Sequence, residues 1–176
     1  MSRFAPMALA LSLSLGVALP PVLARGATAS PSQTTTAVPS GAAPYSERVA
    51  ADTSRGTPAG ATFTVPAGWS ITTRGPVVIL DPPEPDSHLV LVDVSGPKDA
   101  DAAVAVAWAA YRPDTKRPLK LAVPEEAHDG WEERRQYQYE TSPNERVTVF
   151  ALARRAGTQW VVMIVDASDP TFEKRL

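Results

Sequence analysis

Residues 131–166 read WEERRQYQYETSPNERVTVFALARRAGTQWVVMIVD, and this stretch decides the fold. From Trp131 to Tyr139, aromatic and charged residues at odd positions alternate with polar residues at even positions. Such alternation is typical of a strand with one solvated face. Residues 142–145 (Ser-Pro-Asn-Glu) then favour a turn, with proline at the second position and asparagine at the third. A second strand is expected over residues 146–154, after which Ala156 and Gly157 turn the chain again.

The end of this stretch, from Trp160 to Val165, is apolar at every position. A short run of this kind, rich in β-branched residues, indicates a strand that is covered on both faces. The sequence therefore predicts a sheet whose middle lies near Trp160–Val165, with the preceding strands beside it.

The remainder of the domain is expected to hold strands at residues 62–65, 69–73 and 119–123, and a hairpin formed by 77–81 and 88–94. One clear helix is predicted over 99–111, where Val104, Trp108 and Tyr111 form an apolar stripe. Asp99 or Asp101 can cap its first turn. A single helix packed on a mainly antiparallel sheet defines an α+β fold.

A second helix is predicted to begin at Asp169-Pro170, since a capping residue followed by proline is a helix-start signal. Leu176 follows one to two turns later, and a helix this short is marginal in water without tertiary contacts. We therefore expect a truncated C-terminal helix that frays from Thr171 onward.

The N-terminus has the features of a secretory signal peptide. Arg3 precedes an apolar segment over residues 5–19, and small-residue cleavage sites follow at 22–24 and 27–29. Pro20 and Pro21 cut the segment shorter than the about 20 residues that a spanning helix needs. The predicted organisation is a signal peptide at 1–29, a flexible Ser/Thr/Ala/Pro-rich linker at 30–58 and an α+β domain at 59–176. A periplasmic or secreted protein without a stable membrane anchor is expected.

Composition limits the function further. The 176 residues include 17 basic and 19 acidic residues, which gives a net charge of -2. Cleavage after residue 29 would remove Arg3 and Arg25, so the balance becomes 15 minus 19, or -4. No basic stripe is present, which speaks against nucleic-acid binding. Cysteine is absent, so disulfides, thiolate metal sites and cysteine nucleophiles are excluded together.

Motifs that could carry catalysis are weak. Ser95-Gly96-Pro97-Lys98 has the S-x-x-K spacing of a serine nucleophile, but that chemistry needs both side chains on one helix. Here the helix is predicted to start only at Asp99, so a strand-to-helix loop is the better interpretation. His88 and His128 are interpreted as solvated histidines, although His128 next to Asp129 leaves a small hydrolase as a remote alternative. No catalytic residue, metal site or cofactor is predicted.

Arg135, Tyr137 and Tyr139 are the candidate ligand- or partner-binding residues. They share one face of the predicted strand with Glu133. If that face lines a groove, the three side chains suit a peptide or an anionic ligand. The alternative is a sheet edge on which aromatic rings are packed and charged tips remain in water.

Four segments carry a family resemblance: residues 62–69 (TFTVPAGW), 87–94 (SHLVLVDV), 101–111 (DAAVAVAWAAY) and 137–145 (YQYETSPNE). Together they resemble the N-terminal accessory domain of bacterial periplasmic serine hydrolases of the β-lactamase and penicillin-binding class. The resemblance covers about Thr57 to Leu176. The strand-Pro-x-Gly-Trp opening also resembles PsbP- and Mog1-like domains.

This resemblance implies a non-catalytic accessory domain. The serine hydrolase domain, its partner in cis, would follow beyond Leu176. No catalytic residue of the family has a matching position in this chain. The alternative is a free-standing periplasmic module that binds a ligand or a protein.

Overall fold

The computed structural model describes residues 45–175, so the predicted signal peptide and residues 30–44 of the predicted linker lie outside the described part. Within it, the elements follow in this order: β1 (Tyr45–Arg48), β2 (Thr53–Gly56), β3 (Thr62–Val65), β4 (Ser70–Arg74), β5 (Val77–Asp81), β6 (His88–Ser95), α1 (Ala100–Tyr111), β7 (Leu119–Glu125), β8 (Glu133–Tyr139), β9 (Val147–Ala156), β10 (Gln159–Ser168) and α2 (Asp169–Arg175).

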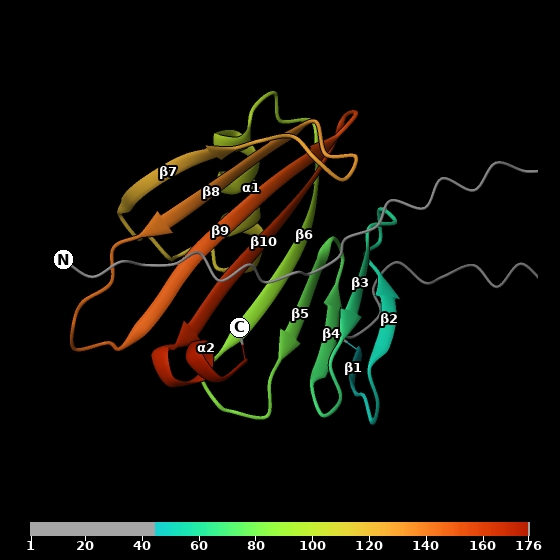
Figure 1. Ribbon diagram of the computed structural model, residues 1–176, viewed down its shortest axis with the longest axis vertical. Coiled ribbons are helices and arrows are strands. Elements are labelled where there is room, and N and C mark those ends of the chain that lie inside the picture. Colours follow the sequence, from blue (N-terminus) through green and yellow to red (C-terminus); the bar gives the residue numbers. More distant parts are fainter. Residues whose placement is uncertain (1–44, 176) are drawn as a thin grey trace, which may run out of the picture.

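Eight of these strands form one antiparallel sheet in the order β1-β4-β5-β6-β10-β9-β8-β7, and β2 pairs with β3 in a separate hairpin (Figure 1). The strand β10 lies in the middle, between β6 and β9. This position explains its apolar sequence, because both of its faces are covered. The predicted α+β class, mainly antiparallel with one principal helix, is confirmed.

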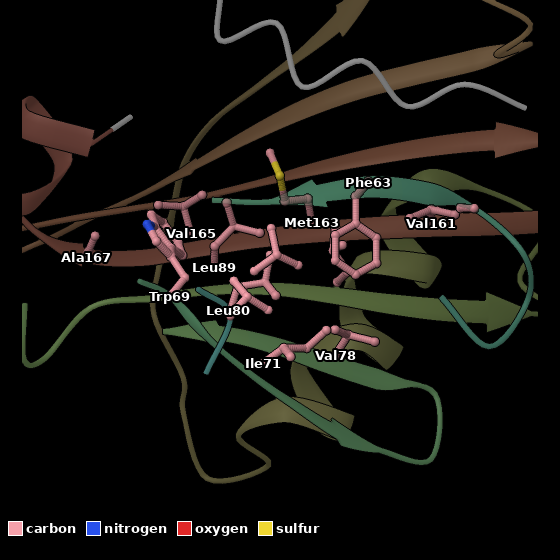
Figure 2. Packing of buried hydrophobic residues seen from close by; sticks show 14 of the residues in the cluster. Phe63, Trp69, Ile71, Val78, Leu80, Leu89, Val161, Met163, Val165 and Ala167 are labelled. Atoms are coloured by element: carbon pink, nitrogen blue, oxygen red, sulfur yellow. The ribbon is translucent and has the colours of Figure 1, made fainter. Parts of the chain in front are cut away.

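Two apolar layers lie on the two faces of the sheet. On one face, Val161, Met163 and Val165 of β10 pack against Phe63 of β3, and Trp69 and Leu80 belong to the same cluster (Figure 2). On the other face, Trp160, Val162 and Ile164 pack against α1. The fold therefore has three layers: the β2–β3 hairpin, the main sheet and α1.

The helix α1 lies close to the sheet because small side chains face it. Ala100, Ala103 and Ala107 are fully buried, and Val104 is buried beside them. The Asp99 carboxylate accepts a hydrogen bond from the backbone N–H of Ala102 at 2.8 Å, which confirms the predicted cap.

Residues 45–56 lie within the predicted linker, but they contain the strands β1 and β2. The strand β1 pairs with β4 and β2 pairs with β3, so partners distant in sequence supply the order that local composition does not. Arg55 and Glu47 add an ion pair at 3.1 Å between the two strands. The folded part therefore includes residues that precede the predicted start at residue 59.

The predicted alternation along β8 is interrupted. Trp131 packs in the cluster that contains Phe63, whereas Tyr137 packs against α1 on the other face. Asp129 and Gly130 adopt positive φ angles of 55° and 81°, and the strand begins only at Glu133, so Trp131 precedes the strand register.

Arg134 was expected on the solvated face of β8 but is buried. Its guanidinium lies 2.8 Å from the Glu125 carboxylate and donates to the Glu126 carbonyl at 3.1 Å. These partners make the burial of the charge tolerable.

The helix α2 begins at Asp169 as predicted and continues to Arg175, past Thr171, where fraying was expected to begin. Thr171 is buried, and the Phe172 ring meets Phe150 edge-on with centroids 5.9 Å apart. Lys174 and Arg175 both reach Glu84, at 2.7 and 2.8 Å. Tertiary contacts thus stabilise a helix that is too short to form alone.

Candidate functional site

The structure places Arg135, Tyr137 and Tyr139 on the face of β8 that meets α1. The Tyr137 hydroxyl donates to the Asp101 carboxylate at 2.6 Å, and the Arg135 guanidinium lies 3.4 Å from the same carboxylate. Burial and this hydrogen bond raise the pKa of Tyr137 far above its usual range. Arg135 and Tyr137 therefore help to hold α1 on the sheet. Glu133 pairs with Arg155 at 3.3 Å. A binding role for Arg135 and Tyr137 stays a prediction.

Tyr139 has a different position, because it lines a cavity beside the C-terminal half of α1. The Trp108 indole N–H donates to the Tyr139 hydroxyl at 2.8 Å, and the two rings meet edge-on with centroids 5.3 Å apart. Burial raises the pKa of Tyr139, so the phenol stays neutral at physiological pH. The cavity has a volume of about 250 Å³. Its lining consists of Ala105, Trp108, Ala109, Arg112, Pro113, Thr115, Lys116, Arg117 and Tyr139.

A second hollow of about 530 Å³ adjoins the first and shares Thr115, Lys116 and Arg117 with it. Pro118 and four polar residues, among them Glu140 and Glu145, line the remainder of this hollow. The loop between α1 and β7 thus forms one wall of both hollows.

The charges around the hollows are mostly balanced. Arg112 pairs with Asp166 at 2.6 Å, and Arg117 pairs with Glu145 at 3.2 Å. The pKa of Glu145 is lowered, first by the backbone N–H of Ser142 and then by Arg117. Lys116 is exposed, and no carboxylate of residues 45–175 lies within ion-pair distance of it. The ammonium group of Lys116, which lines the same hollow as Trp108 and Tyr139, is therefore available to bind a ligand.

Sequence analysis missed Trp108 and Lys116 as members of this site. Trp108 was predicted on the apolar stripe of the helix with Val104 and Tyr111, and in the structure it is half-buried at the side of α1. Its partner Tyr139 is 31 residues away, so their contact depends on how α1 packs on β8. A tryptophan at the margin of an alanine-rich helix, followed by a basic loop, was the available signal.

The side chains of the weak catalytic motifs do not come together in one site. Ser95 donates to the Gln159 side chain at 2.6 Å, and α1 begins only after Lys98, so this S-x-x-K spacing is not on a helix. His128 and Asp129 are 2.6 Å apart on an exposed turn. His88 pairs with Asp81 at 2.6 Å. Across residues 45–175 no three His, Asp or Glu side chains gather in a way that would hold a metal ion.

The described helices include none that is both long enough and apolar enough to cross a membrane.

The three-layer arrangement defines a PsbP-like α+β fold. The solution structure of cyanobacterial PsbP (CyanoP) from Synechocystis sp. PCC 6803 superposes with a TM-score of 0.52 over 80% of this chain and 90% of that chain. The sequence identity is 15%, so the likeness shows the fold alone. It agrees with the weaker of the two resemblances seen in the sequence. No protein-family model and no curated protein sequence matches the chain.

Proposed function

We propose that this chain is a non-catalytic, exported binding module that takes its ligand in the two hollows beside α1. The observation that carries the proposal is the juxtaposition of the Trp108–Tyr139 pair with the unpaired Lys116. Aromatic rings supply flat apolar area, and an unpaired ammonium group favours an anion. The ligand class is an aromatic carboxylate, either free or as the end of a peptide.

The test is a titration of the 15N-labelled protein with benzoate and with a tripeptide that ends in phenylalanine. The indole N–H signal of Trp108, assigned with Trp108→Phe, should move in a saturable manner. Lys116→Gln should weaken the affinity roughly two- to fivefold, the range expected for an exposed ion pair. Lys98→Gln is the matched control, because Lys98 is also exposed but lies before α1. A Trp108 signal that stays still at millimolar ligand would refute the proposal.

A second proposal rests on the four segments that resemble the serine hydrolase accessory domain. In this role the chain would be attached to a β-lactamase-like catalytic domain. The supporting observation is the order of four segments along the chain and their amino-acid sequences, at residues 62–69, 87–94, 101–111 and 137–145. The test is the reading frame after Leu176: an S-x-x-K motif at a helix start supports the accessory role. A stop codon followed by an unrelated gene supports the free-standing module.

A further inference from the structure

The outer strand β7 carries an unusual set of exposed apolar side chains. Leu119, Leu121 and Val123 are 51%, 48% and 39% exposed. The only other large hydrophobic side chain exposed within the described residues is Val106, on α1. Outer strands normally carry charges that prevent pairing with another chain. A group of exposed apolar residues on such a strand marks an interaction surface.

The edge of β7 is also open for hydrogen bonding. The strand ends the sheet order, and β8 is its partner on the inner side (Figure 1). No strand formed by residues 45–175 lies on its outer side. The backbone groups that point outward from β7 are therefore available to another extended segment.

Basic residues gather near one end of β7 and acidic residues near the other. Lys116 and Arg117 precede the strand and Lys120 is its second residue, whereas Glu125 ends the strand and Glu126 follows it. Arg117 and Glu125 are already paired, with Glu145 at 3.2 Å and Arg134 at 2.8 Å. Lys120 and the Glu126 carboxylate, in contrast, have no ion pair within the part of the chain that the structure describes.

This arrangement of charges is self-complementary when the β7 strands of two copies run antiparallel. An alignment centred on Val123 puts Lys120, three residues before the centre, opposite Glu126, three residues after it. A two-fold axis produces the same pair twice, as an isologous interface requires. Val123 then faces its own counterpart, and Leu121 lies diagonal to it, opposite Glu125 of the other copy, so the apolar contact is centred on Val123. We propose that two copies of this chain associate through antiparallel pairing of their β7 strands.

Two features restrict the pairing. Pro124 has no backbone N–H to donate, although its carbonyl still accepts. The β7–β8 register shifts between Leu119 and Leu121, which marks a bulge that bends the strand start. The intermolecular ladder is therefore short and confined to the middle of β7. We expect a dimer with a micromolar dissociation constant, because so short a contact buries little area.

Sedimentation velocity of residues 30–176 from 5 to 500 µM tests the proposal. The unsubstituted chain should shift from monomer to dimer across this range. Lys120→Glu and Glu126→Lys should each weaken self-association about tenfold, because each creates two like-charge contacts. An equimolar mixture of the two variants should associate again, since every contact in the mixed dimer joins unlike charges. Lys98→Glu is the control and should dimerise as the unsubstituted chain does.

Val123→Lys should abolish the dimer, because it places two lysines opposite each other at the two-fold axis. The 39% exposure of Val123 means that the fold should survive, as checked by circular dichroism and thermal unfolding. A chain that remains monomeric at 500 µM would overturn the proposal. So would a dimer that persists in Val123→Lys, or a mixture of charge variants that associates no better than each variant alone.

Discussion

Phe63 gives the most direct test of the three-layer fold, because it joins the β2–β3 hairpin to the main sheet. Its side chain is 2% exposed and lies in the cluster with Val161 and Met163 (Figure 2). If the hairpin is part of the folded domain, Phe63→Ala must leave a cavity between two layers. If residues before β4 are only loosely attached, the change should cost little.

The size of the effect follows from the burial. Moving a phenylalanine side chain out of water contributes about 1.5–3 kcal/mol, and the cavity left behind adds a further term. Together they predict a loss of about 3–5 kcal/mol in the free energy of unfolding. Since whole domains are stable by about 5–15 kcal/mol, this is a large fraction of the total.

Urea denaturation followed by tryptophan fluorescence measures this loss. With a slope of about 2 kcal/mol per molar urea, the midpoint should fall by about 1.5–2.5 M. Val106→Ala is the matched control, because Val106 is 48% exposed on α1, and its effect should stay within about 0.5 kcal/mol. A Phe63→Ala variant that loses less than about 1 kcal/mol would show that the hairpin does not pack on the sheet as described.

Two predictions concern pH. Burial raises the pKa of Tyr111 to about 12, whereas the phenol of an unfolded chain ionises near 10. The native state then holds a proton that the unfolded state has released, so stability should fall as the pH rises from about 10 to 12, and Tyr111→Phe should flatten this part of the curve in urea melts. Hydrogen bonds from Arg175 and then Lys174 lower the pKa of Glu84 to about 2. Its stabilising contribution should be present above the ordinary value of 4.5 and lost as the pH falls through 2, and an NMR titration of the Glu84 carboxyl carbon with a midpoint near 4 would contradict this.

The part of the fold that sequence predicted best is the part in which local pattern and tertiary environment agree. The segment Trp160–Val165 is apolar on both faces and lies in the centre of the sheet. The helix α1 combines an acidic cap with small residues on one side. In both cases each residue is suited to the position that it occupies in the final structure.

The features that sequence did not predict depend on contacts with distant parts of the chain. The strand β2 reads Thr-Ser-Arg-Gly and has no apolar residue, so its pairing with β3 is what orders it. Arg134 is buried because Glu125 and the Glu126 carbonyl approach it from a different segment. The candidate site shows both cases: Tyr139 was recognised on its strand, whereas Trp108 and Lys116 join it only after α1 and its following loop are in place.

The position of β10 has a consequence for the order in which the molecule can form. The strands β4–β6, with β1 beside β4, come from the first half of the described chain, and β7–β10 come from the second half; the halves meet where β10 pairs with β6 (Figure 1). Ser95 and Gln159, which pair at this junction, are 64 residues apart. Closing a loop of this length costs conformational entropy before the stabilising contacts can form, and this slows folding. A nascent chain would therefore keep the inner edge of β6 and both apolar faces of the sheet incomplete until β10 is available.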